Sequence, residues 1–379
     1  RETTQLKDGK LALTLNSQLE EAILFDQVEL AVVDHPEEFE IYPDEKLLPG
    51  PPYLPFRILT AEDTSFPVSA SDGDGNDVLS AIKKIDRRYP PVPDTEPFKG
   101  YTAPHELILD LGTASNDYAV LLMYAWIDYA DSSSNLAASQ AGLQLTPPYL
   151  QVKDDKGNWV TVIERMGFPA GLPKYMTVDL SGKFLSSSRE VRIVTNMKIY
   201  WDQIRIGHGT PRNDFRIKRL QAETAELRFK GNPKPWSPDG KLPRLYNYDE
   251  VYFPDWKVHT GAYTRYGDVR ELLDNKDDFY VITRSGDEIG LTFSLNSLPA
   301  LPEGWVRDYL VFVDGFGKDM DPNSGGPQFL GPLPFHGMSA YPYREEFPEL
   351  QKHLEYREKW NTRHFYRAVP EIGSRRAED

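Results

Sequence analysis

The sequence predicts a mainly β protein, with an antiparallel β-sandwich of jelly-roll layout, flanking β-rich regions and a few short helices. Two observations support this expectation. Short runs rich in Val, Ile, Leu, Tyr and Phe recur along the chain, and the segments between them are rich in Gly, Pro, Asn and Asp. Strand-like and helix-like segments do not alternate, which argues against a doubly wound nucleotide-binding fold.

The stretch from about residue 101 to 207 is the best-defined unit. Leu107, Leu109 and Leu111 alternate with polar residues, as in a strand with one buried face. Residues 154–158 read Asp-Asp-Lys-Gly-Asn, which favours a tight hairpin turn because Gly and Asn adopt positive φ. Short strands joined by such turns predict an antiparallel sandwich. Besides the first strand, we expect strands at residues 120–127, 149–153, 159–163, 176–180, 190–195 and 199–206.

The segment before this unit also favours strands. Alternating or apolar runs predict strands at residues 10–15 and 22–33, followed by a Pro- and Gly-rich loop at 44–55. A helix is expected next, with Asn76 or Asp77 available to cap its first N–H groups. The apolar residues with helical spacing are Val78, Leu79, Ile82 and Ile85.

The C-terminal part follows a Pro- and Gly-rich spacer at residues 231–243. It predicts a short helix near 269–273 and strands at 279–283, 288–295 and 309–314. Leu350, Leu354 and Trp360 then have the spacing of an amphipathic helix that lies against the body or a neighbouring subunit. We therefore expect four regions: an N-terminal β-rich region with one helix (1–98), a central β-sandwich (99–230), a C-terminal β-rich domain (231–343) and a helical tail (344–379).

The charge of the chain excludes several classes of partner. The formal net charge is −15 and the isoelectric point is near 5.0. Nucleic-acid binding needs a basic face, and the same repulsion opposes docking on anionic lipid. No apolar run approaches the roughly 18 residues needed to cross a bilayer, so we expect no membrane insertion.

Cysteine is absent from all 379 residues. This excludes disulfides, thiolate catalysis, Fe–S clusters and cysteine zinc sites. Together with 31 prolines and only 6 methionines, it favours either export or a hot habitat. Of the two, we expect an extracytoplasmic protein, secreted or on the cell surface. The chain begins at Arg1 without a signal-like segment, so we expect a processed product or the ordered part of a longer protein.

Seven short motifs, in this order, resemble the C-terminal region of large exported bacterial proteins that combine FG-GAP-type repeats with an ASPIC/UnbV segment or TPR repeats. The resemblance spans nearly the whole chain. It implies an exported protein with an adhesion or scaffold role, and it supplies no catalytic residues. The FG-GAP repeats themselves are missing from this chain. The motifs are FDQV (25–28), VDHP (33–36), EIY (40–42), DYADSSSN (128–135), MGFPAG (166–171), GAYTRYGD (261–268) and PFHGMS (334–339).

The central unit is also similar in layout to galactose-binding-like jelly rolls. Leu109-Asp110-Leu111-Gly112 and the pair formed by Asp179-Leu180 and Arg192-Ile193 are the residues that resemble that pattern. This likeness concerns the fold and implies little about a ligand.

Two loops of the central unit are candidates for a carbohydrate site. Aromatic rings stack on sugars and carboxylates accept sugar hydroxyls, and both residue types occur in each loop. The alternative is that the rings pack in the core or in a hairpin and that Ser132–Ser134 form a turn. The candidate residues are Trp126, Asp128, Asp131 and Asn135 in the first loop, and Tyr200, Trp201 and Asp202 in the second.

A calcium ion is a candidate ligand for the loop at residues 319–325. Asp319, Asp321 and Asn323 place oxygen ligands at alternate positions, although Ser324 stands where an EF-hand has its sharp-turn glycine. The alternative is an Asx-rich turn without an ion. The loop at residues 72–77 is a second candidate, but its Asn76 and Asp77 also serve as helix caps. No other cofactor is expected.

No motif of an enzyme active site occurs. The sequence lacks a Gly-x-Ser-x-Gly nucleophile elbow, a phosphate-binding glycine loop and a His pair at i, i+4. A catalytic triad stays open because triads assemble in space. Among the histidines, His336 in Phe335-His336-Gly337 is the strongest functional candidate, and structural hydrogen bonding is the alternative.

The leading hypothesis is therefore a non-catalytic extracellular or cell-surface protein that acts through protein partners or self-association, as a subunit of a larger assembly or filament. The first alternative is a carbohydrate-binding module that uses the Trp, Tyr and Asp loops of the central sandwich. The second is a secreted enzyme acting on polysaccharides, whose paired carboxylates the sequence does not identify.

Overall fold

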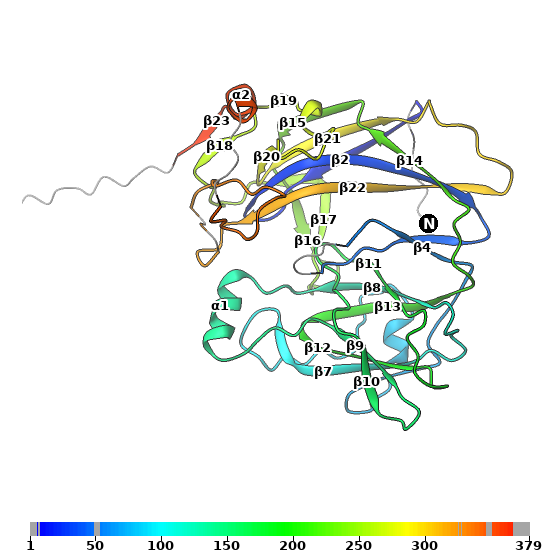
Figure 1. The fold of residues 1–379 in the computed structure, drawn as a ribbon. Helices are drawn as coiled ribbons and strands as arrows, with labels where there is room; N and C mark the ends of the chain where they lie inside the picture. Colours follow the sequence, from blue (N-terminus) through cyan, green and yellow to red (C-terminus); the bar gives the residue numbers. More distant parts are fainter. Residues whose placement is uncertain are drawn as a thin grey trace, which may run out of the picture.

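The structure, a computed structural model, describes residues 6, 8–48, 54–324, 326, 328–345 and 351–366. Strands make up 45% of the protein and helices 7%, which confirms a mainly β fold with antiparallel sheets. Two β-sandwiches lie one above the other in Figure 1. We name them the central sandwich, built from residues 63–208, and the terminal sandwich, built from strands near both ends of the chain.

The central sandwich consists of a five-stranded and a four-stranded sheet. Its core includes Leu109, Met123 and Ile193, all fully or almost fully buried. The strands of the first sheet, in spatial order, are β10 (Trp159–Ile163), β9 (Tyr149–Lys153), β12 (Glu190–Met197), β7 (Tyr101–Asp110) and β6 (Ser69–Asp72). Those of the second are β11 (Lys174–Asp179), β8 (Val120–Ile127), β13 (Ile199–His208) and β5 (Asp63–Ser65).

The terminal sandwich packs two further sheets around a core that includes Leu30, Leu227 and Phe293. One sheet has the order β1 (Lys10–Asn16), β21 (Asp287–Ser294), β15 (Thr224–Phe229) and β19 (Gly267–Asp268). In the other, β2 (Glu21–Pro36) pairs on one side with β14 (Arg216–Gln221) and β20 (Val281–Arg284), and on the other with β22 (Trp305–Asp319).

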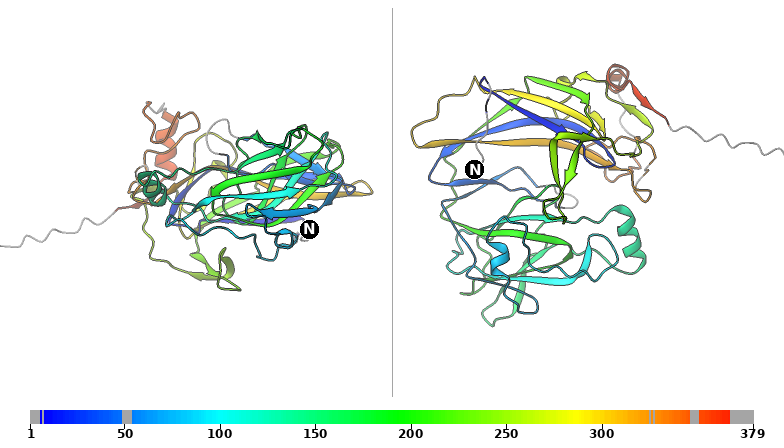
Figure 2. Two further views of the ribbon diagram at one scale, coloured as in Figure 1. Left: turned by 90° about the horizontal axis from the view of Figure 1, so that it is seen from below. Right: turned by 180° about the vertical axis from the view of Figure 1, so that it is seen from behind.

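The chain leaves the terminal sandwich after β2 and returns to it at β14, so the central sandwich is an insertion between these two strands (Figure 2). Strands β1 and β2, within residues 10–36, therefore share sheets with strands from residue 216 onwards. This grouping differs from four consecutive regions, because shifts in composition mark chain segments and not the partners of each strand.

Three two-stranded ribbons complete the described strands. One of them, β16–β17, extends from the terminal towards the central sandwich in Figure 1, where Arg87 binds Asp239 with two hydrogen bonds of 3.2 and 2.8 Å. Its first strand, β16, falls in the expected spacer at residues 231–243, and the prolines of β16, Pro233 and Pro235, are tolerated because the ribbon has no third strand. The ribbons are β3 (Glu40–Pro43) with β4 (Ile58–Ala61), β16 (Asn232–Trp236) with β17 (Leu245–Tyr252), and β18 (Gly261–Tyr263) with β23 (Arg363–Phe365).

The helices are short. The expected helix at residues 78–85 is a single 3-10 turn, η1 (Leu79–Ile82), whose Leu79 N–H is capped by Asp77 Oδ1 at 2.9 Å. The one near 270 is the 3-10 turn η2 (Arg270–Leu272). The α-helices are α1 (Ser132–Gln140) and α2 (Gln351–Trp360). No helix in the described ranges is long and apolar enough to cross a membrane.

The C-terminal helix buries one of the three residues that were expected to pack. In α2 the side chains of His353, Tyr356 and Trp360 are buried against the terminal sandwich, whereas Leu354 is 42% exposed. Leu350 lies outside the described residues. Trp360 therefore packs as expected, and the rings of His353 and Tyr356 pack beside it in place of Leu354.

A β-bulge interrupts the long pairing of β2 with β22. Phe25 pairs with Gly315 and Gln27 with Asp314, so Asp26 is an extra residue without a partner of its own. A bulge bends the strand and turns the side chain of the extra residue. At this point a Cβ on Gly315 would lie 2.1 Å from the carbonyl oxygen of Leu24, so the close approach of the two strands requires glycine.

We expect Gly315→Ala to lower the free energy of unfolding by about 1–3 kcal/mol, because the new methyl group would overlap the backbone of β2. Gly317→Ala on the same strand is the control, since a Cβ there would lie 3.6 Å from its nearest neighbour. Urea unfolding of both variants measures the difference. Equal losses in the two variants would contradict the role of Gly315 at the bulge.

Candidate functional site

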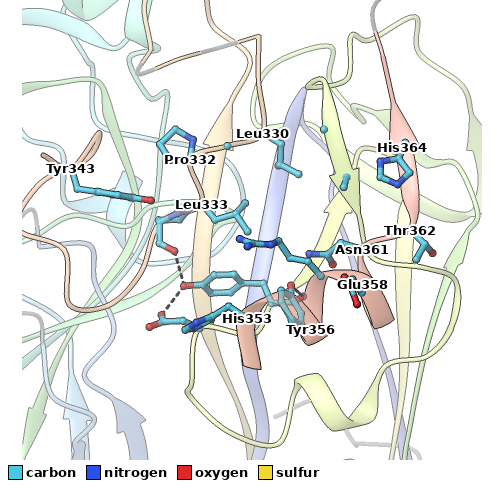
Figure 3. A pocket seen from close by; sticks show the side chains of 17 residues that line it. Leu330, Pro332, Leu333, Tyr343, His353, Tyr356, Glu358, Asn361, Thr362 and His364 are labelled. Carbon is cyan, nitrogen blue, oxygen red and sulfur yellow. Dashed lines mark hydrogen bonds between the residues drawn. The ribbon is translucent and has the colours of Figure 1, made fainter. Parts of the chain in front are cut away.

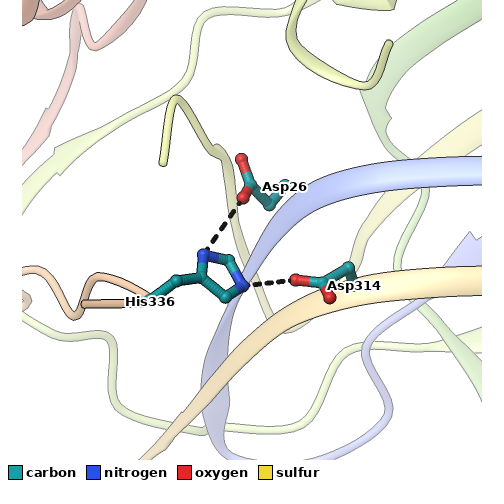
Figure 4. A group of neighbouring side chains, drawn as sticks. All are labelled: Asp26, Asp314 and His336. Atoms are coloured by element: carbon teal, nitrogen blue, oxygen red, sulfur yellow. Dashed lines mark hydrogen bonds and ion pairs between the residues drawn. The ribbon is translucent and has the colours of Figure 1, made fainter. Parts of the chain in front are cut away.

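His336 lies among three aspartates of the terminal sandwich, two of which, Asp26 and Asp314, are drawn in Figure 4. Its Nδ1 is 2.7 Å from Asp278 Oδ1 and 3.4 Å from Asp26 Oδ2, and its Nε2 is 2.6 Å from Asp314 Oδ1. The imidazole thus has carboxylates on both sides. A neutral imidazole has one N–H, so the ring donates to both sides only when it is protonated.

Four separate segments supply this cluster, and each places its side chain for a local reason. Asp26 comes from the bulge of β2, and Asp314 lies beside it on β22. Asp278 belongs to the turn before β20 and has a φ of +67°, a conformation that Asp adopts more readily than most residues. His336 comes from the chain after β22, and its ring lies against Phe316, 5.1 Å between centroids. We call these four residues the His336 cluster.

Asp26 is fully buried and is bound by backbone N–H groups. The N–H groups of Asp277 and Asp278 donate to its Oδ1 at 3.3 and 3.0 Å. Burial raises the pKa of Asp26 to about 6, although these hydrogen bonds and the nearby His336 act in the opposite direction. Asp26 therefore retains a proton at a pH where an ordinary aspartate is ionised.

Asp278 has the opposite character. Its Oδ1 accepts hydrogen bonds from the Tyr280 hydroxyl at 2.7 Å and from the His336 backbone N–H at 3.0 Å, in addition to the contact with the imidazole. Burial alone would raise the pKa of Asp278, but these hydrogen bonds outweigh it and hold the pKa below its usual value. Burial and the charge of Asp278 together raise the pKa of Tyr280, which stays a neutral donor.

The cluster includes a group of atoms suited to a metal ion. Asp26, Asp314 and His336 each offer a ligand atom within 4.8 Å of the others, and they are the one such group among the described residues. The two carboxylates lie on opposite nitrogens of the ring, however, and one ion cannot bind both nitrogens of one imidazole. In the arrangement shown, the ring acts as a hydrogen-bonded bridge that fastens the chain after β22 to β2 and β22.

A cavity of about 700 Å³ adjoins the cluster (Figure 3). Asp278 belongs to both, because it lines the cavity and binds His336. The other walls come from α2, from the β18–β23 ribbon and from residues 330–334. Three of the seven sequence motifs noted above meet here, since Asp26, His336 and the pair Gly261–Ala262 all lie at the cluster or the cavity.

The aromatic residues of the carbohydrate hypothesis separate into two environments. Trp126 stacks on Tyr200 across β8 and β13, with 5.2 Å between ring centroids, and Tyr89 contacts Tyr200 from its edge. Both rings of the stacked pair are half-buried. Trp201, next along β13, points to the other face and is only 4% exposed in the core of the central sandwich.

The polar residues of that hypothesis already have structural partners. Asp202 is 3% exposed and accepts hydrogen bonds from the backbone of Asp86 and Arg87. Asp131 is the N-cap of α1, where it accepts from Ser134 N–H at 2.8 Å, and Asn135 accepts from the Tyr101 hydroxyl. The segment expected as a serine turn is thus the start of a helix.

Asp128, the remaining candidate of the first loop, is half-buried, and burial raises its pKa. Its backbone N–H donates to the Lys198 carbonyl at 3.0 Å. Carbohydrate binding in this region stays a prediction that depends mainly on the stacked pair Trp126 and Tyr200.

The proposed calcium loop connects the two sandwiches. Asp321 accepts hydrogen bonds from the backbone N–H and the hydroxyl of Ser133 in α1, at 2.9 and 2.8 Å. Asn323 donates to the same hydroxyl at 2.8 Å, and Asp319 accepts from the N–H of Asp321 at 3.1 Å. An ion bound through Asp321 would have to displace the Ser133 hydrogen bonds. Calcium at this loop stays a prediction.

Sequence reasoning identified His336 but missed its three carboxylate partners. Asp26 carried a signal, because it is one of only two carboxylates, with Glu29, inside the apolar run of residues 22–33. The sequence around Asp278 and Asp314 carried no such signal, apart from a neighbouring turn or glycine. Their sequence distances from His336 are 58 and 22 residues, so only the folded sheet brings them together.

We expect Asp26→Asn to change how stability depends on pH. Between its ordinary pKa of 3.8 and about 6, Asp26 keeps its proton in the folded state and loses it in the unfolded state. The folded state then binds more protons, so this residue makes the protein less stable as the pH rises through that window. Asn does not ionise, and the variant should gain stability relative to the native protein over the same range.

Urea unfolding of both proteins at several pH values from about 4 to 7 measures this difference. Burial raises the pKa of Glu21 to about 7, and this residue is common to both proteins, so its contribution cancels. A difference that does not vary with pH would show that Asp26 titrates as an ordinary aspartate.

Comparisons with protein-family models, with curated protein sequences and with solved structures found no significant match. The resemblances to exported FG-GAP and ASPIC/UnbV proteins and to galactose-binding-like jelly rolls therefore stay predictions. The function has to be argued from the geometry of this chain.

Proposed function

We propose that this protein is a non-catalytic interaction protein that associates through the outer edge of β22. The observation that supports this most is the pairing of that strand. Among the described strands, β22 pairs with β2 alone, along 15 residues. The backbone N–H and C=O groups on its other edge form a template for a further strand.

The middle of β22 lacks the charges that usually protect such an edge. Residues 309–313 read Tyr-Leu-Val-Phe-Val, and Val311 and Val313 are 43% and 44% exposed. Natural edge strands are commonly blocked by charged side chains, proline or a covering segment. An exposed apolar edge of this length is typical of a surface that pairs with another chain.

A groove of about 570 Å³ adjoins the same residues, and its lining is apolar except for the charged Asp44, Glu45, Lys46 and Arg219. Leu54, Pro55 and Phe56 also line it, and Arg219 lies over the rings of Phe56 and Phe312 at 5.2 Å from each. Side chains of an added strand alternate between its two faces. One face of such a strand would bury its side chains in this groove.

The occupant that we propose is β22 of a second copy of the chain. Two copies of an apolar edge strand pair antiparallel around a two-fold axis, and each then buries the same residues of the other. This arrangement agrees with the hypothesis of a subunit in a larger assembly. The absence of cysteine and the resemblance to exported proteins support an extracytoplasmic location as part of the same proposal.

Carbohydrate binding receives less support. Trp201 and Asp202 are buried, so they are not available to a sugar on the surface. The stacked pair of Trp126 and Tyr200 is the remaining aromatic surface of that hypothesis.

The double variant Val311→Lys/Val313→Lys tests the proposal. Both side chains are exposed in the single chain, so the variant should fold, but the new charges would be buried in a paired edge. We expect its self-association constant to fall by about 100-fold or more, as loss of two buried valines implies. Val160→Lys is the control, because Val160 is 37% exposed on β10, an edge strand of the central sandwich.

Sedimentation equilibrium over a wide concentration range measures association. The net charge of −15 opposes it, so the experiment needs about 0.15 M salt, where the screening length is about 8 Å. A native protein that stays monomeric, or a double variant that associates like the native protein, would refute pairing through β22. Electron microscopy of the native protein then shows whether the pairs extend into filaments.

A further inference from the structure

The cavity beside the His336 cluster is separate from the edge of β22 and has a different chemistry. Its wall is mostly apolar, with Leu330, Pro332 and Leu333 on one side. The rings of Tyr280, Tyr343 and Tyr356 border the same space (Figure 3). A partly enclosed space of about 700 Å³ with apolar walls matches the size of sites for small organic ligands.

The charge of the wall is concentrated on Asp278. Its side chain is 25% exposed, and every hydrogen bond that it accepts from the described residues goes to Oδ1. Oδ2 therefore keeps its capacity to accept a hydrogen bond. The other charged residues of the wall, Glu358 and Arg357, follow each other on α2 and have opposite signs. With the histidines counted as neutral, Asp278 therefore leaves the wall with a formal charge of −1.

We propose that this cavity binds a ligand that presents a protonated amine or guanidine on an apolar or aromatic body. A cation is attracted both to a carboxylate and to the faces of tyrosine rings. The apolar wall would accept the body of such a ligand, and it offers few partners for the many hydroxyls of a sugar. An anionic ligand would meet the charge of Asp278.

Two sources present this chemistry: a free organic amine, and a lysine or arginine side chain of a polypeptide. We therefore choose phenethylamine as the first probe and a blocked Phe–Lys dipeptide as the second. 2-Phenylethanol serves as the neutral counterpart of phenethylamine, because it has the same ring and a hydroxyl in place of the amine. Isothermal titration calorimetry of the full chain near neutral pH measures all three.

We expect phenethylamine to bind about tenfold or more tightly than 2-phenylethanol, as a hydrogen bond between two charged groups implies. Tighter binding of the dipeptide than of phenethylamine would identify a polypeptide as the source, and the reverse order would identify a free amine. Equal affinity for the amine and the alcohol, or no binding of either cationic probe, would overturn the proposal.

Asp278→Asn isolates the charge. Asn tolerates the positive φ of this position, and its amide oxygen still accepts from Tyr280. We expect this variant to lose about tenfold in affinity for phenethylamine and to bind 2-phenylethanol unchanged. Asp277→Asn is the matched control, since it removes the same charge one residue away from the wall, and it should leave both affinities unchanged.

A second variant tests the same cavity in case Asp278→Asn does not fold. Tyr343→Leu removes one ring from the wall at a residue outside the His336 cluster, and the leucine keeps an apolar side chain against Phe335, on which the Tyr343 ring packs at 5.0 Å between centroids. It should weaken phenethylamine binding about threefold or more through the lost ring. If neither Asp278→Asn nor Tyr343→Leu changes the affinity, the probe binds elsewhere and the proposal fails.

Discussion

The terminal sandwich depends on one pairing, that of β2 with β22. Strand β2 runs through the middle of its sheet, with β22 along its whole length on one side and β14 and β20 on the other. Its side chains are buried along most of its 16 residues. The His336 cluster and the proposed interface both use this pairing: the bulge places Asp26, β22 supplies Asp314, and the outer edge of β22 is left without a partner strand among the described residues.

The bulge explains how a buried carboxylate is tolerated in an apolar strand. In regular pairing Asp26 would have followed the alternation of β2, and a charge in that position would have faced the core or a neighbouring strand. The extra residue instead directs it to the N–H groups of the turn before β20 and to His336. These hydrogen bonds compensate part of the free-energy cost of burying a charged carboxylate. The part that is not compensated raises the pKa of Asp26.

The strands of this fold were largely readable from the sequence, because alternation depends on neighbours within one segment. The expected strands at residues 120–127, 149–153 and 159–163 coincide with β8, β9 and β10. Pairing was not readable, since β2 and β22 are joined across about 280 residues and alternation gives a face without giving a partner. The same limit applies to the candidate sites. His336 was identified from its motif, which lies within one segment of the chain. The contact of Asp321 with Ser133 joins residues that are 188 positions apart, and only the folded chain brings them together.

The insertion of one sandwich into the other also sets an order for folding during synthesis. All strands of the central sandwich are present once the chain has been made to residue 208. Strand β2 is made long before them, but its main partner ends at residue 319. A chain synthesised from its N-terminus must therefore keep a 16-residue, mostly apolar strand unpaired while an entire sandwich forms behind it. Exposed strands of this kind are prone to aggregation, and no disulfide is available to hold β2 in place, so the interval before β22 is synthesised is the stage at which this chain is most exposed to aggregation.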